Sequence, residues 1–498
     1  MNRQLNRLAV VAVVLLTALI VATTYWQAWA AGDMKAKQDN AIQRVVQFTI
    51  ARGLIYGANG KTVFAANVKK QVSGNTLYFR RYPHGGLAAQ TIGYSTSARA
   101  QTGLEEALND YLTGSNTNLS GAFHNLLNRL GQATVKGDAL HLTIRPGVQS
   151  LAQRLLGSRC GAVVAMNIHT GALYAMASSP TYNLNEVENN GGYARILKIR
   201  GDCQGASALY NRTTQGLYTP GSTFKMVTAA AALDTGAFTP SSTFYDPGYC
   251  TEYGQQVSNA GNPDQGGREV FGHLNLTTAF EHSVNSVFCN IGKQLGAKTI
   301  LDYAKRFGFY KVPSLELPGN EKYASGLYKY TKRGRVLTDD ASKADPGRLA
   351  FGQWTMLVTP LQMAMVAATI ANGGVVPRPY LVEKVTGPDG STIKTTHPHS
   401  LGRAIKPETA AELNQMMQLV VQGGTGTHAQ IPGVKVAGKT GTAETGVDHI
   451  YTAWFACFAP ADHPQYAVAV VLEKQANGFG GAVSAPIAKQ VLEALLGR

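Results

Sequence analysis

Two pairs of nearly unbroken apolar segments, far apart in the chain, constrain the fold most. The first pair covers residues 163–168 and 172–177, and the second covers residues 452–458 and 466–472. Apolar runs of this length without alternation predict strands that are covered on both faces. We therefore predict an α+β fold in which strands from both pairs form one sheet, and the long middle of the chain is inserted as a helical lobe.

A Ser-x-x-Lys sequence lies at the start of a predicted helix in this middle region. Pro220 and Gly221 suit a helix start, and the strong helix formers of residues 226–233 follow them. In the first turn, Lys225 lies on the same face as Ser222, so its amine is expected within reach of the serine hydroxyl. This pairing predicts a nucleophile with a base beside it. The exposed amides of the helix start favour negative charge on the serine oxygen.

The first motif is weak alone, because Ser391 and Lys394 repeat its spacing inside a turn. Two more patterns follow it along the chain, the Ser-x-Asn sequence of residues 283–285 and the Lys-Thr-Gly sequence of residues 439–441. In this order the three motifs resemble the active-site set of the penicillin-binding proteins and serine β-lactamases. Further segments resemble class B penicillin-binding proteins, the monofunctional D,D-transpeptidases of peptidoglycan synthesis: residues 180–185, 211–212, 358–364 and 371–374.

The resemblance implies a penicillin-binding/serine β-lactamase-like transpeptidase domain over residues 157–498. Its antiparallel sheet would be sandwiched by helices and joined to a helical lobe, and the domain would stand on an N-terminal pedestal domain. The match is looser over residues 52–156, where Arg52 to Ile55 resemble the family's Arg-Gly-x-Ile sequence. Tyr56 and Gly57 differ from the acidic or polar residue and the arginine that often follow in the family.

The resemblance also implies roles for the motif residues. Ser222 would attack the carbonyl between the two terminal D-alanines of a stem peptide and form an acyl-enzyme. Lys225 must be neutral to take the serine proton, which requires a buried site with Lys439 nearby to lower its pKa. The Ser283 hydroxyl would pass that proton to the departing D-alanine, and the Asn285 amide would orient Lys225 and the substrate.

The Lys-Thr-Gly-Thr sequence is expected to be a strand at the edge of the cleft. Thr440 and Thr442 would share one face of this strand and hold the terminal carboxylate, since side chains alternate along a strand. Gly441 would leave space for the substrate to pair along it. The backbone N–H groups of Ser222 and Thr442 would form the oxyanion hole.

The N-terminal segment predicts membrane attachment. Residues 1–7 carry Arg3 and Arg7, and residues 8–22 are uncharged with one polar residue, Thr17. We interpret residues 1–7 as a cytoplasmic tail, residues 8–29 as a single transmembrane anchor and residues 30–156 as an extracytoplasmic stalk and pedestal. The alternative is a cleaved signal peptide, because residues 28–30 resemble a small-x-small cleavage site.

The formal charge of +15 and the pI near 9.5 would admit nucleic acid as a partner. An extracytoplasmic body argues against nucleic acid and favours anionic lipids or cell-wall polymers as neighbours. The five cysteines show neither CxxC spacing nor a zinc pattern, so we predict no metal and no cofactor. An odd count leaves at least one thiol unpaired in a monomer, and the pairing of the others stays open.

The same motifs would also serve a D,D-carboxypeptidase, a β-lactamase or a β-lactam sensor. The anchor, the pedestal and the class B segments favour the transpeptidase, which β-lactams would inhibit covalently. Its partners would be stem peptides, with a D-Ala-D-Ala donor and a diamino residue as acceptor. Residues 30–156 are too few for a glycosyltransferase domain, so the resemblance implies a separate SEDS-type glycosyltransferase in the same membrane.

Overall fold

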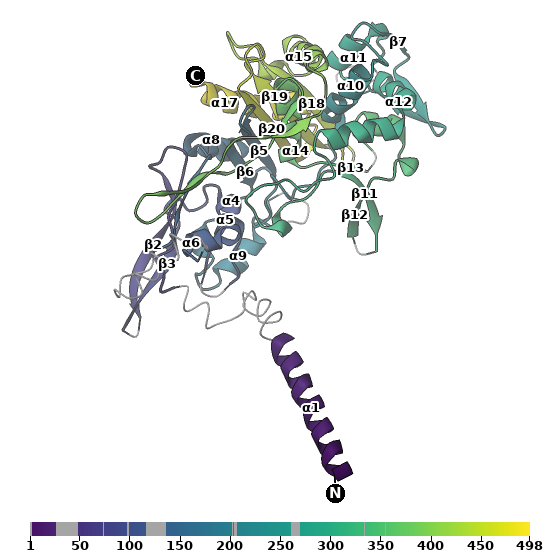
Figure 1. The fold of residues 1–498 in the computed structure, drawn as a ribbon. Coiled ribbons are helices and arrows are strands. Elements are labelled where there is room, and N and C mark those ends of the chain that lie inside the picture. Colours follow the sequence, from purple (N-terminus) through teal and green to yellow (C-terminus); the bar gives the residue numbers. More distant parts are fainter. Residues whose placement is uncertain are drawn as a thin grey trace.

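The computed structural model describes residues 2–25, 48–72, 74–96, 99–115, 136–201, 203, 207–259, 269–332, 334–353 and 355–498. Residues 26–47, which include the end of the predicted anchor and the stalk, lie outside the described residues. The described chain is arranged around two larger sheets, one in each half of the body (Figure 1).

The larger half is built on a five-stranded antiparallel sheet that joins the two apolar segment pairs. Its strands, in spatial order, are β18 (Ala437–Glu444), β19 (Ile450–Ala459), β20 (Tyr466–Ala476), β5 (Gly161–Asn167) and β6 (Leu173–Ser179). The central pairing joins β20 to β5, with Val470 opposite Val163. The prediction that distant apolar segments form one sheet is therefore confirmed.

Helices cover both faces of this sheet. Val163, Val468 and Val470 pack on one face with α8 (Pro146–Leu156) and α17 (Ala485–Leu496). On the other face, Val164, Ala469 and Val471 belong to the core that contains α10 (Lys225–Asp234) and α14 (Pro360–Ala371). Alternate residues of each strand thus enter opposite cores, which explains why these strands show no polar face.

The helical lobe forms the rest of this half. Its helices include α11 (Leu276–Glu281), α12 (Asn285–Arg306), α13 (Pro346–Ala350) and α15 (Pro407–Gln422), with η3 (Gly221–Phe224) directly before α10. Small sheets are made by β7 (Thr243–Asp246) with β10 (Gly272–Asn275), β8 (Tyr249–Glu252) with β9 (Gln255–Ser258), β11 (Gly326–Thr331) with β12 (Gly334–Thr338) and β13 (Met356–Leu357), and β14 (Val375–Pro377) with β17 (Ser400–Arg403).

The chain also forms short elements outside these groups. They are η2 (Leu184–Glu186), η5 (Gly319–Glu321), η6 (Ala341–Lys343), η7 (Thr427–Ala429), α16 (Gly480–Val483) and α9 (Gly192–Lys198), which lies beside α6 in Figure 1.

The smaller half contains a six-stranded sheet that draws on both parts of the sequence. Its order is β16 (Thr392–Thr395), β15 (Val382–Thr386), β4 (Ala139–Leu142), β1 (Ile55–Tyr56), β2 (Val63–Val72) and β3 (Asn75–Arg81). The green β15–β16 hairpin runs from the larger half to the purple strands in Figure 1. A division of the chain at residue 157 therefore does not separate the two sheets. The second Ser-x-x-Lys sequence also belongs to this sheet, because Ser391 directly precedes β16.

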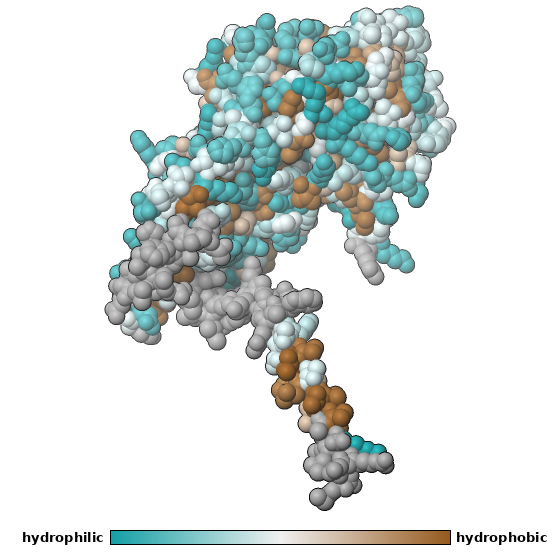
Figure 2. All heavy atoms as spheres, in the orientation of Figure 1, coloured by the Kyte–Doolittle hydropathy of each residue, from teal (hydrophilic) through white to brown (hydrophobic). Residues whose placement is uncertain are grey.

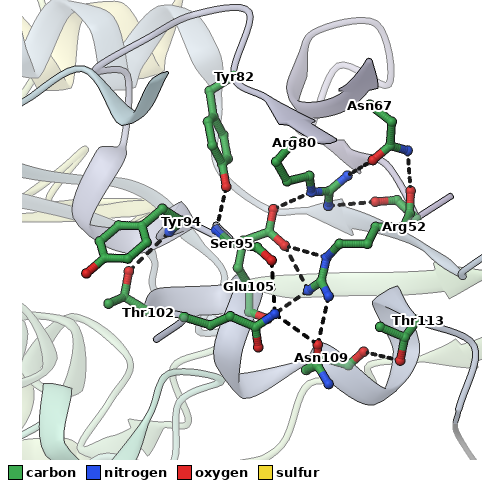
Figure 3. A network of polar contacts seen from close by, with 12 residues as sticks. Arg52, Asn67, Arg80, Tyr82, Tyr94, Ser95, Thr102, Glu105, Asn109 and Thr113 are labelled. Carbon is green, nitrogen blue, oxygen red and sulfur yellow. Dashed lines mark hydrogen bonds and ion pairs between the residues drawn. The ribbon is translucent and has the colours of Figure 1, made fainter. Parts of the chain in front are cut away.

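A buried ion cluster closes the smaller half around short helices. These are α4 (Ala89–Ile92), α5 (Gly103–Ala107) and α6 (Asn109–Leu112). The fully buried Glu105 carboxylate lies 2.9 Å from Arg52 Nη2 and 2.6 Å from Arg80 Nε (Figure 3). Gly53 has no room for a side chain, because an added Cβ would lie 1.7 Å from the Asp138 carbonyl oxygen. In the Arg-Gly sequence, Arg52 thus binds the buried carboxylate and Gly53 lets the chain pack closely against Asp138, and both contacts stabilise this half.

Helix α1 (Asn2–Thr24) carries aliphatic side chains from Val10 to Val21 that are exposed (Figure 2). Among the described residues, no helix combines the length and the apolar character that crossing a membrane requires.

Two disulfides cross-link the larger half. Cys160 pairs with Cys203, and Cys250 pairs with Cys289, which leaves Cys457 as a free and buried thiol in β19. The pairing that the sequence left open is therefore settled by the fold.

Candidate active site

The nucleophile turn is a 3₁₀ helix rather than the first turn of an α-helix. Ser222 lies in η3, and Lys225 is the first residue of α10. Because a 3₁₀ helix has three residues per turn, positions i and i+3 are eclipsed, and Lys225 follows Ser222 on one face. Gly221 has φ +53°, and an added Cβ would lie 2.9 Å from the Thr442 carbonyl oxygen. The glycine is required where the turn meets β18.

Lys225 is held by the second motif. Its Nζ, which is fully buried, lies 2.6 Å from the Ser283 carbonyl oxygen, 3.2 Å from Ser283 Oγ and 2.8 Å from Asn285 Oδ1. Within the described part of the chain, no hydrogen bond joins Lys225 to Ser222, contrary to the direct pairing expected from spacing. A neutral amine can donate to the Ser283 carbonyl and to Asn285 and still keep its lone pair for a proton.

Ser283 adopts a left-handed backbone conformation, with φ +60°. It lies between the C-terminus of α11 and the N-terminus of α12. A non-glycine residue with positive φ costs on the order of 1–3 kcal/mol and persists where the surrounding structure enforces it. Here the conformation places both the carbonyl and the hydroxyl of one residue against the Lys225 amine.

A buried carboxylate that sequence reasoning missed organises this motif. Asp246, which is fully buried at the end of β7, accepts four hydrogen bonds: from Gly248 N at 2.8 Å, Ser286 Oγ at 2.5 Å, Asn259 Nδ2 at 2.8 Å and Phe271 N at 2.9 Å. Asn259 also accepts from the backbone of Ser286 at 3.0 Å. In the sequence, Asp246 precedes Pro247 and Gly248 and signals only a turn.

The β8–β9 hairpin supports the motif from its other side. Asn285 Nδ2 donates to the Ser258 carbonyl at 3.1 Å, so its Oδ1 is directed at Lys225. The Cys250–Cys289 disulfide ties the same hairpin to α12. Apart from the presence of the cysteines, no sequence pattern predicts this pairing.

The third motif lies in β18, at an edge of the five-stranded sheet. Lys439 is fully buried, and the Thr440 and Thr442 hydroxyls lie on the opposite face of the strand. Thr440 Oγ1 lies 2.6 Å from Thr425 Oγ1, and Thr442 Oγ1 accepts from Gly480 N at 3.2 Å.

Gly441 is required for packing within the protein. An added Cβ would lie 2.7 Å from the Pro220 carbonyl oxygen and 2.9 Å from Thr223 Cγ2. The glycine therefore allows the nucleophile turn to pack directly against the edge strand. The expectation that it also leaves space for substrate along the strand stays a prediction.

Two buried lysines dominate the electrostatics. Burial, and then the charge of Lys439, hold the pKa of Lys225 well below its ordinary value. Burial lowers the pKa of Lys439 to about 7. No ion pair joins either amine to a carboxylate among the described residues, and each lies near an aromatic ring: Lys225 Nζ is 5.1 Å from the Phe288 centroid and Lys439 Nζ is 5.5 Å from that of Phe280. The site can therefore hold a neutral base beside a cation that titrates near neutrality.

Glu281 is the carboxylate nearest to Ser283 in sequence, and it is the last residue of α11. Its Oε1 lies 3.3 Å from the position of an added Cβ on Gly423, beyond the end of α15.

Comparison with known proteins identifies relatives over the whole chain. Residues 161–493 match the family model described as "Penicillin binding protein transpeptidase domain", and residues 52–140 match "Penicillin binding protein A dimerisation domain". The chain is 34% identical to the peptidoglycan D,D-transpeptidase PbpA of Mycolicibacterium smegmatis, with 100% of this chain and 99% of the relative covered. It is 28% identical to the peptidoglycan D,D-transpeptidase FtsI of Escherichia coli K12, with 84% and 67% covered.

The structure is similar to that of penicillin-binding protein A from M. tuberculosis in its ceftriaxone acyl-enzyme complex. The TM-score is 0.79 at 32% sequence identity, and the match covers 91% of this chain and 100% of the other.

The two lysines predict a pH dependence for acylation by a fluorescent penicillin. If Lys225 acts as the base in its neutral form and Lys439 binds the carboxylate of the penicillin in its charged form, the acylation rate should rise as Lys225 loses a proton and fall as Lys439 does. Lys439→Gln removes a positive neighbour that lowers the pKa of Lys225. We expect the rising limb to move to higher pH and the falling limb to disappear. A rising limb that stays in place or moves to lower pH would contradict this electrostatic coupling.

Asp246→Asn is expected to slow acylation by about tenfold to a hundredfold, because loss of the carboxylate displaces Ser286 and hence Asn285. The measurement is the rate constant for labelling by fluorescent penicillin. Asp234→Asn is the matched control, since this carboxylate at the far end of α10 accepts from Lys406 N and Thr409 Oγ1. The control should lower the thermal unfolding midpoint but change the labelling rate by less than about twofold. Equal slowing in both variants would show a general loss of stability instead.

Proposed function

The chain belongs to the penicillin-binding protein transpeptidase family, and from this we propose that it is a peptidoglycan D,D-transpeptidase that cross-links stem peptides through a Ser222 acyl-enzyme. The observation that carries the proposal is the binding of the buried Lys225 amine by Ser283 and Asn285 directly after the Ser222 turn. That arrangement supplies a nucleophile, a base and a route for the proton.

In the acylation step, the Ser222 oxygen attacks the carbonyl carbon between the terminal D-alanines of the donor. Lys225 takes the serine proton, and the Ser283 hydroxyl relays a proton to the amine of the departing D-alanine as the C–N bond breaks. The amine of a diamino residue on an acceptor stem peptide then attacks the ester. A new amide bond forms, the C–O bond to Ser222 breaks, and the serine regains its proton.

Edge strand β18 would bind the donor. Lys439 with the hydroxyls of Thr440 and Thr442 would hold the terminal carboxylate, and Gly441 lets the nucleophile turn approach this strand. The backbone N–H groups of Ser222 and Thr442 would stabilise the oxyanion, at roughly 2.7–4 kcal/mol for each donor. A β-lactam acylates the same serine, but its departing part stays tethered and blocks the acceptor amine.

Ser222 is predicted to be the only acylation site. Mass spectrometry after penicillin treatment should find one adduct, on the peptide that contains Ser222, and Ser222→Ala should remain folded without an adduct. The adduct should persist for many minutes or longer, and Glu281→Gln should not change its lifetime, because a transpeptidase that must wait for an acceptor amine gains by lacking a hydrolytic base. An adduct in Ser222→Ala would refute the nucleophile, and rapid release that is lost in Glu281→Gln would identify a β-lactamase.

We also propose that the protein lies in the cell membrane as a single-pass protein, with the N-terminus in the cytoplasm and the catalytic domain outside. Support comes from the uncharged residues 8–22 and from the exposed aliphatic side chains of α1. Protease added to intact spheroplasts should remove the body and leave the N-terminal segment protected. A mature N-terminus near Ala31 would instead identify a cleaved signal peptide.

The glycan strands would come from a separate protein, a SEDS-type glycosyltransferase in the same membrane. Support comes from family membership and from the use of the N-terminal region, because residues 52–140, where a fused glycosyltransferase would have to lie, match a dimerisation domain instead. The purified chain alone should form no glycan polymer from lipid II, and polymer formation would refute the separate partner.

A further inference from the structure

A hollow beside the nucleophile turn is not used by the mechanism above. Its volume is about 790 Å³, and its lining includes Tyr218, Thr219, Tyr330, Arg335, Glu444 and Lys474. Thr219 lies three residues before Ser222, and Glu444 lies two residues after Thr442 at the end of β18. The hollow therefore adjoins both the turn that carries the nucleophile and the strand that would bind the donor.

Glu444 is the carboxylate of this hollow that is available to a ligand. It is exposed, and no ion pair involving it occurs among the described residues. Glu473 also lines the hollow, but it lies 3.1 Å from Arg212 Nε and accepts a hydrogen bond from Tyr218 Oη at 2.7 Å. The charge of Glu473 is thus neutralised within the protein.

The register of an extended donor places its third residue at Glu444. Side chains two apart on a strand share a face, so Thr440, Thr442 and Glu444 form one row with steps of about 6.6–6.8 Å. An extended peptide has the same repeat. With the terminal carboxylate held between the Thr440 and Thr442 hydroxyls, the scissile carbonyl, one residue further along the donor, is beside Thr442 and Ser222. One more residue brings the side chain two residues before the C-terminus within reach of Glu444.

The opposite direction along β18 is closed. Ala437, at the beginning of the strand, is fully buried, and α15 packs against this strand. A donor held by its terminal carboxylate can therefore extend only toward Glu444 and the hollow. Arg335 and Lys474 give the hollow positive charge as well, which suits a peptide that carries an ammonium and a carboxylate.

We propose that Glu444 binds the side-chain ammonium of the third stem-peptide residue of the donor, and that the hollow holds this part of the peptide. The inference rests on the proposed transpeptidase function and adds a determinant of donor specificity. Glu444 acts on binding and not on the bond-forming steps, so its effect belongs to KM.

The test compares two donor pentapeptides that end in D-Ala-D-Ala and differ only at residue three, which is lysine or Nε-acetyl-lysine. The reaction measured is exchange of the terminal D-alanine for a labelled D-amino acid supplied in excess. The ability of each peptide to slow labelling by fluorescent penicillin gives a second measure of binding. Wild-type protein should prefer the lysine donor by roughly threefold to fivefold, mainly through KM. The preference should shrink at high salt.

Glu444→Gln should abolish the preference, and Glu444→Lys should reverse it toward the acetylated donor. Asp448→Asn is the matched control, because it removes an exposed carboxylate from the same β18–β19 connection outside the hollow, and it should keep the wild-type preference. Equal use and equal binding of both donors by wild-type protein, or an unchanged preference in Glu444→Gln, would overturn the inference. Failure of penicillin to acylate Ser222 would instead overturn the proposed function.

Discussion

Two lysine amines buried in one cleft impose the requirement that the rest of the active site satisfies. A charged amine is strongly disfavoured away from water unless an opposite charge accompanies it. Neither Lys225 nor Lys439 has a carboxylate partner in the described structure, so the protein stabilises the neutral form of the first. Burial thus favours the form of the Lys225 amine that has the free lone pair a base needs.

Burial alone would leave the Lys225 amine without a fixed direction. The Ser283 carbonyl and Asn285 Oδ1 supply that direction, and the Asp246 carboxylate with the β8–β9 hairpin holds the backbone that presents them. The strained conformation of Ser283 is therefore supported by a buried polar network. On the other side of Lys225, all ten residues of α10 are buried, which fixes the helix that carries the base.

The sequence predicted those features that depend on local pattern. Unbroken apolar runs identified β5, β6, β19 and β20 as strands of a covered sheet, because a strand buried on both faces carries apolar side chains at almost every position. The three motifs identified the residues around the cleft.

Features that depend on distant partners could not be predicted in the same way. The Asp246 network joins residues up to 40 positions apart, and the disulfides and the β15–β16 hairpin depend on contacts that no local spacing encodes. Gly441 shows the same limit, since its neighbours Pro220 and Thr223 lie more than two hundred positions earlier in the chain. A sequence motif can thus identify a residue, whereas the contact that requires this residue is made with a distant part of the chain.

Because β20 pairs with β5, the central sheet can form only after the ribosome has synthesised both distant segments. A ribosome produces Ser222, Lys225 and Asn285 long before it reaches Lys439, and β5 and β6 can pair into the sheet only after residues 437–476 have supplied its other three strands. A chain that ends before Ala437 contains the nucleophile but lacks the strand against which its turn packs. Such truncated products cannot form the site, so reactivity toward penicillin requires the strands from Ala437 to Ala476.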